Sequence, residues 1–188
     1  MKRLFFNKAL RILISTNALV LFAGAMLGPI YALFVERIGG DLLDASFAGA
    51  VFALAAGITT YISGKYSDTI KENELIIVSG YLVMGLGFFL YLFASSVWHI
   101  LLFQVIIGFG EAIYSPAFDA VYSKHLDGHK SGKQWGAWES MNYFTTAIGA
   151  IVGGVVVTWL GFNSMFLIMS ALCFISALYI YLLPRKIL

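Results

Sequence analysis

The sequence predicts an all-α membrane protein whose six transmembrane helices form two inverted three-helix repeats. Three observations lead to this prediction. Hydrophobic residues make up 60% of the 188 residues and charged residues only 12%, with a mean hydropathy of +0.86. Soluble domains carry about 25% charged residues, so the excess apolar surface is expected to face lipid. The other two observations are six apolar segments of spanning length and a strong asymmetry of basic residues.

Each of the six segments is mostly apolar over about 20 residues, the length a helix needs to cross a bilayer. The polar breaks between them are too short to hold a soluble domain, so residues 1–188 are expected to form one transmembrane domain. The predicted spans are Ile12–Val35, Ala45–Ser67, Leu75–Ser95, Val97–Tyr122, Trp135–Leu160 and Met165–Leu183.

The first span follows several basic residues, as the apolar region of a signal peptide would. Its apolar run covers 24 residues, which is longer than the roughly 7–15 residues of a signal sequence. No convincing small-residue cleavage site ends the run, so we expect a retained helix.

Basic residues fix the expected orientation, because cytoplasmic loops carry an excess of Lys and Arg. With six spans, eleven of the twelve Lys and Arg residues fall on the side of the two termini, and only Arg37 falls on the other. We therefore expect a multi-pass protein of the plasma or inner membrane with both termini cytoplasmic. The eleven are Lys2, Arg3, Lys8, Arg11, Lys65, Lys71, Lys124, Lys130, Lys133, Arg185 and Lys186.

An internal repeat relates the first and fourth spans. An offset of 87 residues places Pro116 on Pro29 and Gln104 on Asn17. Each proline lies in the second half of its span, where the missing N–H favours a kink. The chain then divides into two triplets, residues 1–95 and 97–188, which enter the membrane from opposite sides because three is odd. Chance coincidence of apolar helices is the alternative.

Polar residues inside lipid usually face a protein interior or a water-filled cavity. They gather on the first, fourth and fifth spans, so these spans are expected to face a cavity or a partner. The third and sixth spans carry only Ser, Tyr and Gly as polar residues and are expected to face lipid. The candidate substrate or proton-coupling residues are Glu111, Gln104, Asn17, Tyr31, Ser115 and Asn142.

Glu111 is the most informative of these, because it falls at the middle of its span. An ionised carboxylate there costs about 2.5–3.5 kcal/mol on insertion scales. A carboxyl group poised between its charged and neutral forms suits proton coupling or a cationic ligand; a protonated packing residue is the alternative. Asp119 and Glu139 lie nearer the cytoplasmic side, where ion pairs with neighbouring lysines are expected.

The fifth span contains Gly149-x-x-x-Gly153, with Gly154 beside it. Small residues at this spacing let another helix approach closely. We interpret these glycines as helix-packing residues.

The pattern as a whole resembles the major facilitator superfamily. That family has two six-helix halves, each built from two inverted triplets, whose first helices line the substrate cavity. The family's loop motif between the second and third helices is matched at its front by Gly64 and Asp68, which implies a gating role for this loop. Thr69 stands where a basic residue is usual and Lys71 where a glycine is usual.

Two further motifs of the family are weakened. Gln104 stands where many members have an arginine, four residues before a glycine that Gly108 matches. The glycines of the fifth span resemble the antiporter motif without its proline. The resemblance covers all six spans and implies half of the family's fold.

The resemblance implies a secondary transporter, or a transporter half, that moves a small solute by alternating access, with proton coupling as one option. One half forms only one wall of a cavity, so a homodimer or a second half-transporter is the expected partner, besides the lipid bilayer. The alternative is a non-transporting half that serves as a scaffold or regulator.

Other classes of function lack their motifs. An intramembrane serine protease would need a Gly-x-Ser-Gly sequence, and Ser63-Gly64 and Ser79-Gly80 lack the leading glycine. No phosphate-binding loop is present, and neither the lone Cys173 nor the histidines have metal-ligand spacing. Because these motifs are missing, we expect no enzyme activity, no cofactor and no metal. The net charge of only +2 also predicts no nucleic-acid partner.

Overall fold

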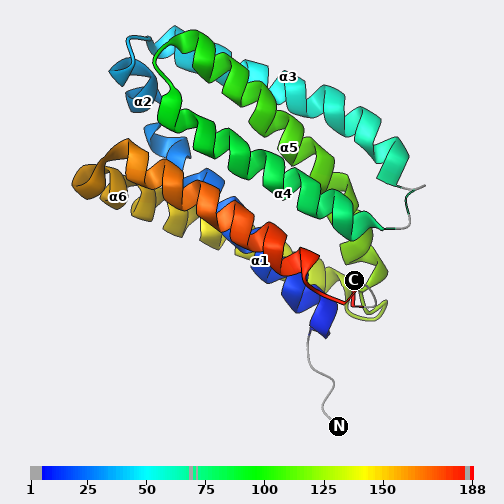
Figure 1. Cartoon of the computed structure of the whole chain (residues 1–188). Coiled ribbons are helices and arrows are strands. Elements are labelled where there is room, and N and C mark those ends of the chain that lie inside the picture. Colours follow the sequence, from blue (N-terminus) through cyan, green and yellow to red (C-terminus); the bar gives the residue numbers. More distant parts are fainter. Residues whose placement is uncertain (1–5, 68–69, 71, 185–186) are drawn as a thin grey trace.

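The computed structural model describes residues 6–67, 70, 72–184 and 187–188, and these residues form helices joined by short turns (Figure 1). The predicted all-α class is confirmed. Part of the basic asymmetry and of the loop motif lies outside the described residues, namely Lys2, Arg3, Asp68, Thr69, Lys71, Arg185 and Lys186.

The first predicted span is a broken helix. α1 (Lys8–Leu27) begins after Asn7, whose side chain accepts a hydrogen bond of 2.8 Å from the Leu10 N–H. It ends at the 3₁₀ turn η1 (Gly28–Ile30), and the chain continues as α2 (Tyr31–Arg37). Pro29 explains the break, because it cannot donate to the carbonyl four residues earlier and its ring crowds that turn.

The next three spans are single long helices. They are α3 (Leu42–Ser67), α4 (Asn73–Leu90), which ends in the 3₁₀ turn η2 (Tyr91–Phe93), and α5 (Val97–Lys124). α5 remains helical through Pro116, so the two prolines of the proposed repeat have different effects on their helices.

The last helix, α6 (Ser131–Tyr181), covers two predicted spans. Its backbone leaves the helical region at Gly161, with φ 80° and ψ 170°, a conformation that glycine adopts readily. The chain reverses there, so residues 131–160 form a first arm and residues 162–181 a second, antiparallel arm (Figure 1). Among the described residues, five helical segments are thus long and apolar enough to span a membrane, and the fifth folds back at Gly161 into two arms that correspond to the fifth and sixth predicted spans.

Glycines set the closest contacts between helices. In the first arm of α6, a Cβ on Gly149 would lie 2.8 Å from the Ala25 Cβ, and one on Gly153 would overlap the Met26 backbone. A Cβ on Gly154 would meet open space. The first and fifth spans therefore pack backbone to backbone along one glycine face.

The second and fourth spans form a similar pair. A Cβ on Gly108 of α5 would lie 2.7 Å from the Phe52 carbonyl oxygen of α3. Nearby, the Ser63 hydroxyl donates a hydrogen bond of 2.7 Å to the Ala112 carbonyl. α4 packs against both α5 and α6, and Ser170 of the second arm donates a hydrogen bond of 2.8 Å to the Gly85 carbonyl.

The third span is more enclosed than expected. Of the spanning segments, α4 is the most buried and α3 the least. The expectation that the third and sixth spans face lipid is wrong for the faces that pack inside the bundle, because α4 lies between α5 and the second arm of α6. Its glycines allow this close packing: a Cβ on Gly80, for example, would lie 2.6 Å from the Tyr114 Cβ of α5.

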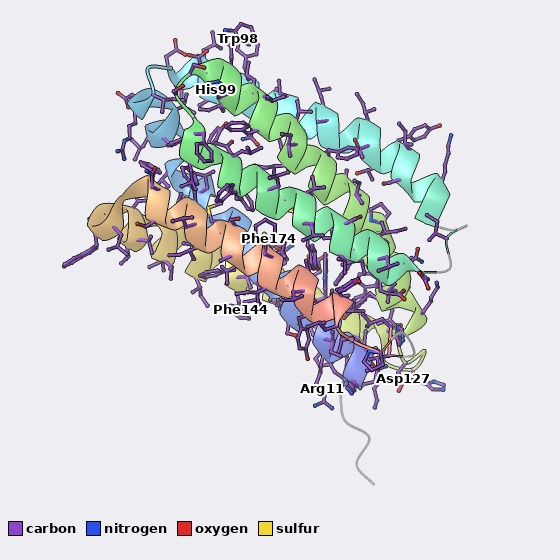
Figure 2. The ribbon with its side chains drawn as sticks, viewed as in Figure 1. Arg11, Trp98, His99, Asp127, Phe144 and Phe174 are labelled. Atoms are coloured by element: carbon purple, nitrogen blue, oxygen red, sulfur yellow. The ribbon has the colours of Figure 1, made fainter. Side chains whose placement is uncertain are left out.

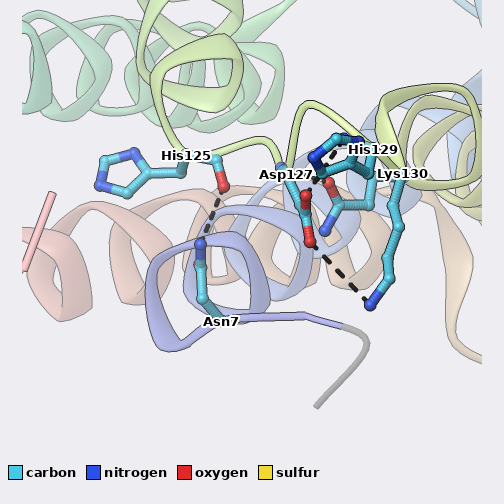
Figure 3. Close-up of polar contacts among 6 residues, drawn as sticks. Asn7, His125, Asp127, His129 and Lys130 are labelled. Carbon is cyan, nitrogen blue, oxygen red and sulfur yellow. Dashed lines mark hydrogen bonds and ion pairs between the residues drawn. The ribbon is translucent and has the colours of Figure 1, made fainter. Parts of the chain in front are cut away.

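Different polar and aromatic residues lie at the two ends of the bundle. Figure 2 places the exposed Trp98 and His99 at one end and Arg11 and Asp127 at the other. At the latter end, the Asn7 side chain donates a hydrogen bond of 2.8 Å to the His125 carbonyl, which ties the start of α1 to the α5–α6 turn (Figure 3).

The expected ion pairs of Asp119 and Glu139 are not formed. Both side chains are exposed, and they lie close enough for their charges to interact. Within the described part of the chain, neither forms an ion pair with Lys124, Lys130 or Lys133; instead, Lys130 lies 3.9 Å from Asp127 in the same turn (Figure 3). Asp127 therefore pairs with Lys130 within the short turn between α5 and α6. The boundaries of the predicted spans did not indicate this pairing.

The start of α1 and the last described residues, 187–188, lie at the same end of the bundle (Figure 1), and we predict that this end is cytoplasmic. Reporter fusions after Leu188 and within residues 38–41 should show opposite sides, with the terminal fusion active only as a cytoplasmic reporter. A terminal fusion active only outside the cell would reverse the orientation, and equal accessibility of both fusions would contradict the six-pass topology.

Candidate functional site

A pocket of about 410 Å³ lies among the helices and receives side chains from most of them. This volume is in the range of pockets that hold drug-sized molecules. Most lining residues are apolar, and a few polar groups converge among them. The lining residues are Val20, Leu21, Gly24, Ala25, Leu27, Gly28, Tyr31, Gly49, Phe52, Met84, Phe88, Tyr91, Gln104, Ile107, Glu111, Tyr114 and Thr146.

Glu111 lies on the pocket wall at the middle of α5 and is half-buried. Among the described residues, no basic side chain forms an ion pair with it. A carboxyl group in an apolar wall without a cationic partner is costly in its ionised form. The arrangement can therefore take up a proton or receive a cation from outside the chain.

Gln104 and Tyr31 also line the pocket, together with Tyr91, which sequence reasoning missed. Gln104 precedes Glu111 by seven residues on α5, which places the two about 10 Å apart along the helix axis. The pocket therefore has two separate polar regions, one at Glu111 and one at Gln104, with apolar wall between them.

The other three candidates do not line the pocket. Asn17 is 1% exposed, and its side chain accepts a hydrogen bond of 3.2 Å from the Tyr81 hydroxyl. The Tyr81 ring packs against Tyr114, a pocket residue, with ring centres 4.9 Å apart. Asn17 is thus placed behind the wall. Ser115 and Asn142 are half-buried outside the pocket.

Helix geometry explains the difference along α5. The pocket residues Gln104, Ile107, Glu111 and Tyr114 recur at steps of three and four and share one face. The neighbouring face, which includes Gly108, packs against α3. The sequence candidates merged these two faces, because Ser115 was grouped with Gln104 and Glu111. Helical spacing from Glu111 could have found Tyr114, and Thr146 is a polar residue of the fifth span, which was expected to face a cavity. Tyr91 carried no sequence signal that set it apart.

The remaining candidates bear on other roles. Gly64 is half-buried near the end of α3, and its motif partners Asp68 and Lys71 fall outside the described residues. Among the described residues, no group of three or more His, Cys, Asp or Glu side chains could hold a metal ion. Cys173 is fully buried as a free thiol.

Comparison with known sequences decides the family. Residues 13–187 match the profile of the Major Facilitator Superfamily. The chain belongs to this superfamily. It is therefore an integral, multi-pass membrane protein of a family of transporters.

Several curated members of the superfamily are similar over most of this chain. A protein named multi-drug resistance efflux pump PmrA homolog, from Lactococcus lactis, is 29% identical over 151 residues, which are 80% of this chain and 37% of that protein. Two proteins named multidrug resistance protein MdtG, from Dickeya zeae and Salmonella typhimurium, are 23% and 20% identical. They match 91% and 87% of this chain, and 43% and 41% of their own lengths. The chain thus spans about two fifths of these relatives.

Proposed function

We propose that this chain is a six-helix unit of a secondary transporter that moves a small amphipathic organic cation across the membrane. The observation that carries the proposal is Glu111, an acidic side chain on the wall of an otherwise largely apolar pocket. The names of the similar relatives, which refer to multidrug resistance, support the same class of substrate.

Charge and shape favour an organic cation over a sugar or an anion. None of the described lining residues is a Lys or Arg, so an anion there would meet only Glu111 and neutral groups. The apolar wall, with Phe52 and Phe88, would leave most sugar hydroxyls without partners, which is costly. An aromatic or aliphatic amine would place its charge at Glu111 and its apolar body against the wall.

Alternating access and proton coupling complete the proposal. A proton and a cationic substrate would compete for the Glu111 carboxylate, so protonation from one side would release the substrate. This six-helix unit would rock as one body against a second unit. Within the unit, the helix pairing supports two inverted triplets, because exchange of the first span with the fourth, and of the second with the fifth, maps one glycine-lined pair onto the other.

A second six-helix unit is part of the proposal. The exposed pocket residues Gly28, Gly49 and Thr146 mark the mouth of the pocket. The helices beside this mouth present large exposed apolar side chains, such as Tyr61 of α3 and Tyr143 of α6, which are 72% and 74% exposed. We propose that a second copy or a second half-transporter covers this face and closes the cavity.

We expect the chain to form dimers in lipid nanodiscs when it is purified alone. Native mass spectrometry should show a species of twice the 20.6 kDa chain mass. A Tyr143→Arg change on the exposed face should shift the population towards monomers, whereas Trp98→Arg at the end of the bundle should not. Monomers alone, in a preparation that still transports, would contradict the need for a partner.

The transport proposal is tested with tetraphenylphosphonium, a lipophilic cation, in proteoliposomes with an imposed proton gradient. Accumulation above protein-free liposomes, abolished when the gradient is collapsed, is the expected result. Binding without accumulation under any gradient would favour the alternative, a non-transporting six-helix unit that acts as a scaffold or regulator.

A further inference from the structure

Two tyrosine hydroxyls at one end of the pocket make no well-formed hydrogen bond. Tyr91 is 1% exposed and Tyr31 is half-buried, and both line the pocket. The hydroxyl oxygens of both are buried, and neither makes a hydrogen bond within the described part of the chain. Buried polar groups are rarely left in this state unless another molecule satisfies them.

Both tyrosines are set by 3₁₀ turns that end long helices. Tyr31 follows η1, where Pro29 breaks the first span, and Tyr91 opens η2 at the end of α4. The Tyr31 hydroxyl lies near both the Tyr91 hydroxyl and the Gln104 amide, within reach of hydrogen-bonding interactions with them, but neither contact has the geometry of a formed hydrogen bond. Three groups from three separate spans therefore converge at one polar end of the pocket.

The Tyr91 ring is firmly held. It packs against Phe34, Phe103 and Phe166 with ring centres 5.5, 5.6 and 5.0 Å apart. The hydroxyl therefore cannot easily turn towards another partner in the protein. A hydroxyl and an amide can each donate and accept a hydrogen bond, so this end suits a neutral polar group rather than a second charge.

We infer that the pocket recognises a two-ended ligand, an amine at Glu111 and a neutral hydrogen-bonding group, such as an amide, at Tyr31, Tyr91 and Gln104. This inference rests on the proposed function and narrows its substrate class. Glu111 and Gln104 are two helical turns apart, so the amine and the neutral group are separated by about 10 Å. Phe88 and Ile107 belong to the apolar wall that would hold the ligand body.

The test uses two probes of similar size, a phenylbutylamine with a para-carboxamide and the same amine with a para-isopropyl group. Their dissociation constants are measured on the full chain in nanodiscs by isothermal titration calorimetry. We expect the wild-type chain to bind the carboxamide about three- to tenfold more tightly, the effect of one or two neutral hydrogen bonds.

Tyr91→Phe and Tyr31→Phe keep the rings and remove only the hydroxyls. Each should reduce the preference for the carboxamide, and the double change should abolish it, while binding of the isopropyl probe stays within about twofold. Melting temperatures close to wild type would show that both variants fold, and if one of them does not, the other still carries the test.

Glu111→Gln separates this inference from the function on which it rests. It should weaken both probes equally and leave their ratio unchanged. If Glu111→Gln weakens both probes but the tyrosine variants keep the wild-type ratio, the two-ended ligand is wrong and the cation site stands. If Glu111→Gln weakens neither probe while the tyrosine variants collapse the ratio, the cation site fails and the polar end stands. Equal wild-type binding of the two probes would overturn the inference directly.

Discussion

Glu111→Gln should lower the affinity for a lipophilic cation by roughly tenfold or more and remove proton-driven transport. A hydrogen bond or ion pair to a charged group contributes about 1.5–3 kcal/mol, and each 1.4 kcal/mol is a factor of ten in affinity. Glutamine keeps the size of the side chain but has neither a negative charge nor a transferable proton. Affinity is measured by calorimetry with tetraphenylphosphonium, and transport in proteoliposomes across a range of pH.

Two controls make the Glu111 result specific. Glu139→Gln removes an exposed carboxylate outside the pocket and should leave affinity and transport unchanged. Glu111→Asp keeps the charge and should retain a pH-dependent rate, although the shorter side chain weakens binding. A Glu111→Gln chain with wild-type affinity and an unaltered pH profile would show that this carboxyl group only fills space.

The second large effect is expected at the contact between α1 and the first arm of α6. Gly153→Leu should prevent most of the protein molecules from folding, because even a Cβ at this position would overlap the Met26 backbone. Overpacking costs about 1–3 kcal/mol, and occasionally more, and a helix backbone cannot move aside as a flexible side chain can. The measurement is the fraction of a fluorescent fusion that elutes as a single folded species in detergent.

Gly154→Leu is the matched control, because it adds the same side chain one residue further along the helix. Its Cβ would meet open space, so folded yield should stay near wild type. Gly149→Leu should be intermediate, because a Cβ there would lie 2.8 Å from the small Ala25 Cβ. Equal yields for the variants at 153 and 154 would mean that the two helices do not pack as described.

The sequence was sufficient to predict the all-α membrane class and an acidic residue on the pocket wall. Apolar length reports on lipid directly, and a carboxylate such as Glu111 is rarely placed at mid-membrane without a cavity. It was not sufficient for Tyr91, because an aromatic residue at the end of an apolar helix looks like an ordinary interfacial side chain. Asn17 was expected in the pocket because the repeat aligns it with Gln104. Aligned residues of a repeat need not face the same cavity, and Asn17 lies behind the pocket wall while Gln104 lines the pocket.

The sequence also did not predict that α4 would be enclosed by other helices. Hydropathy cannot distinguish lipid from a protein interior, since both are apolar, so a span without charges was assigned to lipid. Glycines such as Gly80 and Gly85 carried the missing information, because backbone contact needs them and lipid contact does not.

The reversal at Gly161 also bears on how the chain enters the bilayer. The two arms of α6 are joined by one glycine with a left-handed backbone, and no polar loop separates them. The next residue, Phe162, lies under the Arg37 guanidinium at 5.6 Å and beside the Phe34 ring at 5.2 Å. We therefore expect the two arms to insert into the membrane together as one hairpin, whose turn then docks on α2, a segment synthesised more than a hundred residues earlier.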